Sequence, residues 1–249
     1  KCYWSRKGQL RWCNLQNQLM KIFVTGATGF IGSYVIRQLL NEGYKNINAI
    51  KRKSSKLHLV EDVAHHVQWI DCDLFNIPVL DDYIKNADAI IHVAGMISFP
   101  ERNRKAVFKT NVEGTANLIN IALCHNVKRF IHFSSVAALG NSKNQIDESM
   151  TGTEISSKSI YSLSKYFGER EAWRGYAEGL NLSIINPSFV LGASYWDFGP
   201  LEMIKRLDKG LKFYPVGING VVDVRDVAKM CSLLLAREDM TGTRFICSA

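Results

Sequence analysis

The residues best placed by type and spacing to do chemistry are Ser135, Tyr161 and Lys165. Tyr161 and Lys165 are four positions apart, so a helix would put both on one face. A tyrosine hydroxyl has an ordinary pKa of about 10, and a neighbouring ammonium favours the phenolate and lowers that pKa. Ser135 directly follows an apolar strand, where its hydroxyl could orient a substrate oxygen beside Tyr161. Together the three predict acid–base chemistry at a carbonyl or an alcohol.

The segment that would hold a cofactor beside these residues is a glycine-rich turn. Gly26, Gly29 and Gly32 follow an apolar strand and precede an amphipathic helix. In such a turn the first glycine allows the sharp bend, the second lets backbone amides approach a pyrophosphate, and the third allows close helix–strand packing. A glycine turn without a ligand is the alternative. The residues expected at the phosphates are Gly26, Thr28, Gly29, Phe30, Ile31 and Gly32.

The end of the second expected strand should meet the adenosine ribose. A carboxylate there would bind the 2′-hydroxyl of NAD, whereas this chain has the acid-free segment 51–56 (KRKSSK). Arg52 suits a 2′-phosphate because its planar guanidinium can pair with two phosphate oxygens. We therefore expect NADP, with NAD as the second option; a solvated charged loop is the alternative. After the third strand, Asp73 and Leu74 are expected at the adenine, although Asp73 could equally cap a helix.

Short apolar runs alternate with amphipathic stretches from Met20 onward, a pattern typical of βα units on a parallel sheet. The expected strands are Lys21–Thr25, Ile47–Ile50, Val67–Asp71, Ala89–Val93, Arg129–Ser134, Leu182–Asn186 and Arg244–Cys247. The expected helices are Ile31–Asn41, Asn111–His125, Ile160–Glu178, Pro200–Lys209 and Val224–Ala236. The order predicts an α/β doubly wound parallel sheet, a Rossmann fold, with its ligand crevice at the carboxyl ends of the strands.

This order of elements also predicts the domain organisation. Residues 20–188 are expected to form the NAD(P)-binding domain, 189–217 part of a small substrate lobe, and 218–249 a return to the first domain. The last expected strand is followed by nothing that could cover it, so we expect a truncated chain. Residues 1–19 are expected to be extraneous or disordered, because Met20 directly precedes the first strand; a basic nucleic-acid-binding arm is the alternative.

Composition excludes several classes of protein. The chain has 249 residues, 47% of them hydrophobic and 22% charged, with 18 Gly and 5 Pro, so it is neither collagenous nor of low complexity. No apolar run reaches the roughly 18 residues of a membrane span. The six cysteines form no C-x-x-C pair and no cluster with histidine, which argues against a structural zinc and favours reduced thiols in the cytoplasm.

Several short motifs lie along the chain in a fixed order: Thr25–Gly32, Asp73-Leu74, His92–Gly95, Asn111–Thr115, Ser134-Ser135, Tyr161–Lys165, Asn186–Ser188 and Val222–Val227. Together they resemble the extended short-chain dehydrogenases/reductases, also called the NAD-dependent epimerase/dehydratase family. The resemblance implies a catalytic triad of Ser135, Tyr161 and Lys165 and no metal. It also implies that Val93, Ala94, Gly95 and Lys165 contact the cofactor ribose and that Pro187 and Ser188 flank the nicotinamide. Asn111 matches the family's helix-start asparagine, whose role is structural or catalytic.

Departures within the family point to a narrower group. The segment 186–192 (NPSFVLG) looks more like dihydroflavonol reductases and 3β-hydroxysteroid dehydrogenases than like sugar-nucleotide epimerases. The segment 135–137 (SVA) lacks the acid found there in sugar dehydratases. The mostly apolar stretch His92–Phe99 suits a hydrophobic carbonyl compound. Aromatic side chains that could extend this wall are Phe99, Phe189, Tyr195, Trp196 and Phe198.

The sequence therefore predicts an NADP-dependent oxidoreductase that transfers hydride between the nicotinamide and a carbonyl or alcohol of a small, largely apolar substrate. An NAD(P)-dependent sugar-nucleotide epimerase is the first alternative, and a non-catalytic NADP-binding regulator is the second. The expected partner is a small molecule, with neither nucleic acid nor a membrane. A homodimer through the helices at 111–125 and 160–178 is expected by analogy with the family.

Overall fold

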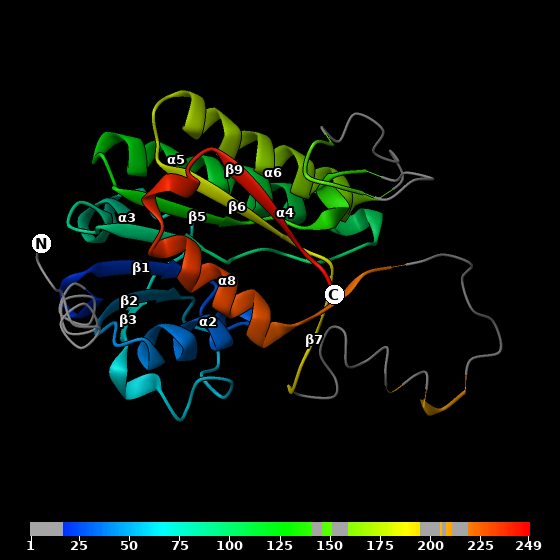
Figure 1. The fold of residues 1–249 in the computed structure, drawn as a ribbon, viewed down its shortest axis with the longest axis horizontal. Coiled ribbons are helices and arrows are strands. Elements are labelled where there is room, and N and C mark those ends of the chain that lie inside the picture. The colour runs from blue at the N-terminus through cyan, green and yellow to red at the C-terminus, as the bar shows by residue number, and fades with distance from the viewer. Residues whose placement is uncertain (1–16, 141–145, 151–158, 195–204, 206–207, 211–218) are drawn as a thin grey trace, which may run out of the picture.

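The computed structural model describes residues 17–140, 146–150, 159–194, 205, 208–210 and 219–249. Seven parallel strands form one sheet in the order β3-β2-β1-β4-β5-β6-β9, which confirms the doubly wound Rossmann architecture (Figure 1). The strands of this sheet are β1 (Lys21–Thr25), β2 (Asn46–Lys51), β3 (Gln68–Asp71), β4 (Ala89–His92), β5 (Arg129–Phe133), β6 (Leu182–Pro187) and β9 (Thr243–Cys247). Each of the seven overlaps an expected strand, with ends that differ by at most one residue.

Helices cover both faces of the sheet. One face carries α2 (Phe30–Asn41) and α8 (Val224–Leu235), and their side chains join one apolar cluster with the strands. The other face carries α3 (Ile77–Ile84), α5 (Gly114–Cys124) and α6 (Ile160–Ala177), which join a second cluster. The short helix α4 (Arg104–Phe108) precedes a π-helical turn at Lys109–Glu113. Neither α3 nor α4 was expected from the sequence.

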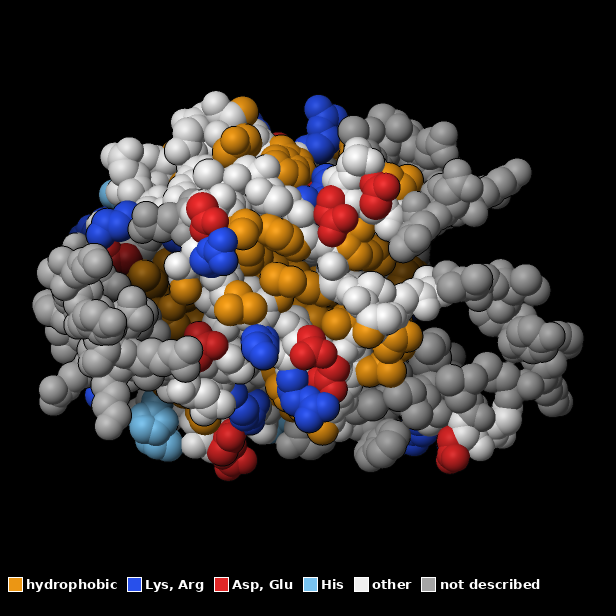
Figure 2. Space-filling view, in the orientation of Figure 1, with side chains coloured by type: hydrophobic (Ala, Val, Ile, Leu, Met, Phe, Trp, Pro, Cys, Tyr) orange, Lys and Arg blue, Asp and Glu red, His pale blue; other side chains and the backbone are white. Residues whose placement is uncertain are grey.

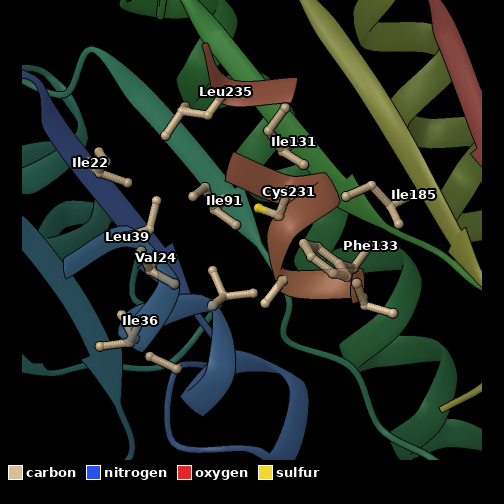
Figure 3. Close-up of a cluster of buried hydrophobic side chains, with 14 of the residues drawn as sticks. Ile22, Val24, Ile36, Leu39, Ile91, Ile131, Phe133, Ile185, Cys231 and Leu235 are labelled. Atoms are coloured by element: carbon tan, nitrogen blue, oxygen red, sulfur yellow. The ribbon is translucent and has the colours of Figure 1, made fainter. Parts of the chain in front are cut away.

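The central strands are buried on both faces, which explains why they read as continuous apolar runs. β5 is buried along its whole length. Its odd-numbered residues Ile131 and Phe133 pack toward α8, beside Cys231 and Ile185 (Figure 3). Burying each such aliphatic or aromatic side chain contributes about 1.5–3 kcal/mol. Packing of the core therefore fixes the positions of the strand ends, where the expected site residues lie.

A second, two-stranded parallel sheet was not expected. β7 (Phe189–Leu191) pairs with β8 (Val221–Asp223) in parallel. Ser188 links this small sheet to the main one, since its amide donates to the carbonyl of Cys247 at 2.9 Å. The helix expected over residues 200–209 lies mostly outside the described residues, as does most of the expected substrate lobe at 189–217.

The N-terminal end of the described chain packs against the sheet. Asn17 Nδ2 donates to the Glu42 carbonyl at 2.9 Å, and Asn46 Nδ2 donates to the Gln18 carbonyl at 2.7 Å.

Figure 2 shows apolar side chains gathered over the α8 side, with charged side chains around them. On α8, Leu233 is 51% exposed.

Candidate active site

The expected crevice lies where the strand order reverses, between β1 and β4. The carboxyl ends of these strands lie so close that a Cβ on Gly26 would be 2.5 Å from the Ala94 amide nitrogen. Gly26 also has a φ of +73°, a conformation that disfavours every side chain. Only glycine therefore fits at this bend.

The turn leads directly into α2 with its first amides open. Gly29 is the N-cap of α2, no side chain caps the helix, and its first turn holds no acid. These amides and the helix dipole are suited to a phosphate group. A Cβ on Gly32 would be 2.1 Å from the Gly26 carbonyl oxygen, so this glycine is needed within the turn itself rather than for helix–strand packing.

A buried polar chain ties β1 and β4 to α5. Thr25 Oγ1 lies 2.7 Å from His92 Nδ1, and His92 Nε2 lies 3.0 Å from Thr115 Oγ1. Thr115 donates its own proton to the Asn111 carbonyl at 2.8 Å, so it accepts from His92 Nε2–H, and Thr25 donates to Nδ1. Burial lowers the pKa of His92 to about 3, which keeps the ring neutral as this arrangement requires. The chain holds the floor of the crevice rigid.

The structure brings Ser135 and Tyr161 together from two elements. Tyr161 is the second residue of α6, whose N-cap Ser159 accepts a hydrogen bond from the Ser162 amide at 3.2 Å. Ser135 follows β5, and its hydroxyl accepts from the Ala137 amide at 3.2 Å. The Ser135 side chain also hydrogen-bonds Tyr161, which lowers the pKa of the phenol, while burial raises that pKa by more. The phenol is therefore neutral and able to donate its proton.

Lys165 lies one turn further along α6 and is buried. Its Nζ donates to the Phe133 carbonyl at 2.9 Å, at the end of β5. Burial lowers the pKa of Lys165 to about 8, and the charge of Glu169 opposes this shift. The lowering of the Tyr161 pKa that the spacing led us to expect from Lys165 is not found; Ser135 is the group that lowers it. A Cβ on Gly95 would lie 3.2 Å from Lys165 Nζ, so Gly95 leaves room beside the ammonium.

Asn111 has a structural role in the described part of the chain. It lies in the π-helical turn and grips the loop after β4, because its Oδ1 accepts from the Met96 amide at 2.7 Å and its Nδ2 donates to the Met96 carbonyl at 2.9 Å. The same Nδ2 donates to Ser164 Oγ at 2.9 Å. The side chain thus fixes the loop Val93–Met96 against α6.

The three residues expected to contact the adenosine, namely Arg52, Asp73 and Leu74, have different surroundings. Arg52 is exposed beyond β2, in a turn closed by a 2.8 Å hydrogen bond from the Ser55 amide to the Arg52 carbonyl. Asp73 is exposed and accepts from the Phe75 amide at 2.8 Å; the N-cap of α3 is Asn76, so Asp73 does not cap that helix. Leu74 is buried against Gly114, which places its side chain in the core.

Two buried hydroxyls at the other end of the crevice have no hydrogen-bond partner among the described residues, namely those of Ser134 and Ser188. Buried polar groups normally have a partner, so both are suited to a polar ligand group. With the glycine turn and the space at Gly95, they fit a dinucleotide lying from α2 toward Pro187. The expected aromatic residues Tyr195, Trp196 and Phe198 lie outside the described residues.

Sequence reasoning missed the residues behind the site. Asn186 Nδ2 donates to the Ser135 carbonyl at 2.9 Å and to Glu169 Oε2 at 2.7 Å. Glu169 also pairs with Arg244 of β9. The signal available in the sequence is a glutamate four positions after Lys165, on the same helix face as Tyr161.

Comparison with known proteins decides the family. The family model described as "NAD dependent epimerase/dehydratase family" matches residues 22–246. The chain belongs to this family. A putative dihydroflavonol 4-reductase from Synechocystis sp. is 34% identical to it over 213 residues, which cover 83% of this chain and 60% of the relative. The chain thus spans less than two thirds of that relative's length.

Three further proteins extend the comparison. Cinnamoyl-CoA reductase 1 from Petunia hybrida is 28% identical over 244 residues, covering 91% of this chain and 72% of that protein. The crystal structure of gox2253 matches with a TM-score of 0.80 and 30% identity, covering 92% of this chain and 70% of that one. The structure of UDP-glucuronic acid 4-epimerase from Bacillus cereus with UDP-glucuronic acid and NAD has a TM-score of 0.81 at 20% identity, over 92% of this chain and 78% of that one. That last likeness shows the shared fold.

The described residues contain neither a membrane-spanning helix nor a cluster of metal ligands. None of the helices there combines the length and the apolar character needed to cross a membrane. Among the same residues, no group of three histidine, cysteine or acidic side chains is arranged to hold a metal ion.

Proposed function

We propose that this family member is an NADP-dependent oxidoreductase that reduces the carbonyl group of a small, largely apolar substrate, or oxidises the corresponding alcohol. The observation that carries the proposal is the hydrogen bond between the side chains of Ser135 and Tyr161 beside the buried ammonium of Lys165. A neutral phenol, a hydroxyl and a cation at the mouth of a dinucleotide crevice form an acid–base site for a carbonyl oxygen.

The nicotinamide, when bound, supplies the hydride that reaches the carbonyl carbon. Tyr161 donates its proton to the carbonyl oxygen, so that the carbonyl becomes an alcohol and Tyr161 a phenolate. Ser135 donates a hydrogen bond to the same oxygen and holds it beside the phenol. Lys165, with its ammonium fixed by the Phe133 carbonyl, would bind the ribose hydroxyls and so hold the nicotinamide beside Tyr161.

The apolar substrate is supported by the loop after β4. Ile97 and Phe99 are each 66% exposed. The Phe99 ring meets the Tyr161 ring edge to face, with 6.0 Å between centroids. Exposed apolar side chains beside a reactive phenol favour a hydrophobic carbonyl compound over a sugar diphosphate. The names of the relatives, a putative dihydroflavonol 4-reductase and a cinnamoyl-CoA reductase, agree with this class.

The preference for NADP is supported by the charges beyond β2. Arg52, Lys53 and Lys56 are exposed there. We expect Arg52→Ala to weaken NADPH binding about tenfold and to leave NADH binding unchanged, since one charge-assisted contact to phosphate contributes about 1.5 kcal/mol. Fluorescence titration of both cofactors measures this, with Lys45→Ala at the other end of β2 as the matched control. Tighter binding of NADH than of NADPH by the unchanged protein would sink the NADP proposal.

A cytosolic location is supported by the thiols. The cysteines in the described part of the chain, namely Cys72, Cys124, Cys231 and Cys247, are all free.

The experiment that tests the function is steady-state oxidation of NADPH over a panel of aromatic ketones, aldehydes and UDP- and GDP-sugars. We expect turnover with the apolar carbonyl compounds. Interconversion of sugar nucleotides without net oxidation of cofactor would instead establish an epimerase. Cofactor binding without turnover of any compound would favour a regulator.

A further inference from the structure

Behind the proposed site lies a buried carboxylate that the reaction itself does not use. Glu169 is 3% exposed and lies on α6, one turn after Lys165 and two turns after Tyr161. Its Oε1 pairs with Arg244 of β9 and accepts from Trp173 Nε1 at 3.2 Å. Its Oε2 accepts from Asn186 Nδ2 at 2.7 Å. Both carboxylate oxygens are therefore held in place.

Asn186 connects Glu169 to Ser135 by hydrogen bonds. The same Nδ2 that donates to Glu169 also donates to the Ser135 carbonyl at 2.9 Å. Asn186 is fully buried at the end of β6. Two hydrogen bonds thus connect a carboxylate on α6 to the backbone of Ser135, whose hydroxyl bonds Tyr161. The strand end and the helix are locked together at the point where the proton transfer would occur.

The negative charge of Glu169 also affects the ionisation of Lys165. Its charge raises the pKa of the ammonium against the effect of burial. Among the described residues, Lys165 also acts on His92 and His132, whose pKa values burial lowers far enough to keep both rings neutral. Tyr161, one turn earlier on α6, is neutral too, because burial raises its pKa. Arg244 approaches Glu169 from β9 and offsets part of its charge. Glu169 is thus the acid that acts on the buried ammonium.

We propose that Glu169 is a positioning residue of the site: through Asn186 it fixes Ser135, and from one turn further along α6 its negative charge favours the ammonium form of Lys165. The inference rests on the proposed function for its catalytic meaning. Stability alone is a weak reason for this buried ion pair, since apolar residues of equal volume are often as stabilising. The Glu169 carboxylate thus acts on both Ser135 and Lys165, the two residues that assist Tyr161.

The charge role is tested by NMR of lysine labelled with 13C at Cε, with the Lys165 signal assigned by Lys165→Met. We expect Lys165 to titrate near its pKa of about 8 in the unchanged protein and about one unit lower in Glu169→Gln. Glu169→Asp retains the charge and should restore most of the shift. Glu171→Gln, on the same helix and paired with Arg174, should leave the titration unchanged.

Because Glu169→Gln leaves Arg244 unpaired, the double variant Glu169→Gln/Arg244→Met is measured beside it and removes both charges at once. A Lys165 titration that stays at its original pH in folded Glu169→Gln would overturn the charge role, and the double variant shows how much of any shift comes from the unpaired Arg244. The NMR titration requires no turnover, so it tests the charge role of Glu169 even if the protein shows no reductase activity.

The bridging role is tested by Asn186→Ala, which leaves the Glu169 carboxylate in place. We expect kcat to fall about tenfold or more with KM for NADPH unchanged, because Ser135 loses its anchor, while the Lys165 titration keeps its midpoint. An unchanged kcat in the folded variant would overturn the bridge.

Discussion

At the scale of single residues, the hydroxyl of Tyr161 has the most direct role. We expect Tyr161→Phe to lower kcat about 10²- to 10⁴-fold, since the variant keeps the ring but has no proton to donate. Binding of NADPH should be preserved, because Lys165 and the glycine turn are untouched. Stopped-flow or steady-state NADPH oxidation, with fluorescence titration of the cofactor, measures both quantities. Turnover close to that of the unchanged protein would refute the assignment.

His132 gives a pH-dependent prediction. It is 2% exposed, and neither ring nitrogen has a hydrogen-bond partner among the described residues. Burial holds its pKa well below 6.5 in the folded protein, while the unfolded chain takes up a proton near that pH. Acid therefore favours unfolding by up to about 1.4 kcal/mol per pH unit below 6.5.

We expect His132→Leu to remove this contribution and to flatten the loss of stability between pH 6.5 and 5. Urea unfolding at several pH values measures the slope. His92 has hydrogen bonds on both ring nitrogens, and its own contribution should remain in the variant. Equal slopes for the variant and the unchanged protein would contradict the prediction.

Sequence alone could identify individual site residues only where a local pattern accompanies them. Tyr161, Lys165 and Ser135 follow from helical spacing and from the end of an apolar strand. Helical spacing places Glu169 on the face of Tyr161 and Lys165 but does not reveal its role, because its partners on β6 and β9 are 17 and 75 residues away along the chain. The pKa of Tyr161 also depends on burial, which spacing does not reveal.

At the scale of elements, the turn between β1 and α2 predicts a large difference between glycines. We expect Gly26→Ala to destabilise the protein by more than about 2 kcal/mol and to abolish NADPH binding, because φ is +73° and the Cβ would overlap the Ala94 backbone. Gly179→Ala is the matched control. Its φ is also positive, but a Cβ there would meet nothing within 4 Å, so we expect a loss of about 1 kcal/mol.

Chemical denaturation and cofactor titration of the two glycine variants test this comparison. Similar losses of stability in both would mean that backbone conformation, and not the close approach of β1 and β4, explains the glycine at position 26.

There are physical reasons why some elements could not be predicted from the sequence. Helix α3 has eight residues and contains Pro78 in its first turn, so its periodicity is too short to distinguish it from a loop. The helix expected from Asn111 begins instead as a π-helical turn, and the regular α5 starts at Gly114. The β7–β8 pair joins segments about thirty residues apart, and no local pattern reveals such pairing.

At the scale of the whole molecule, the expected homodimer stays a prediction. α6 carries Phe167, which is 38% exposed and lies 6.1 Å from the Phe108 ring between centroids. If α5 and α6 form the dimer contact, Phe167→Glu should turn a dimer into a monomer, because it puts a charge into an apolar interface. Leu233→Ser, on the opposite helical layer, is the control and should not change the mass.

Sedimentation equilibrium of the three proteins over a range of concentrations measures the oligomeric state. A monomer in the unchanged protein would contradict the dimer, and a dimer that persists with Phe167→Glu would place the contact elsewhere.

The position of β9 at the edge of the sheet has a consequence for synthesis. During translation, β5 and α6 leave the ribosome before β9, so Ser135, Tyr161 and Lys165 have all emerged while Glu169 still lacks Arg244. A nascent chain at that stage buries a carboxylate without its cationic partner, which opposes docking of α6 on the sheet. Emergence of β9 would then supply the missing cation, so that a ribosome-bound intermediate without β9 should lack the reactive geometry.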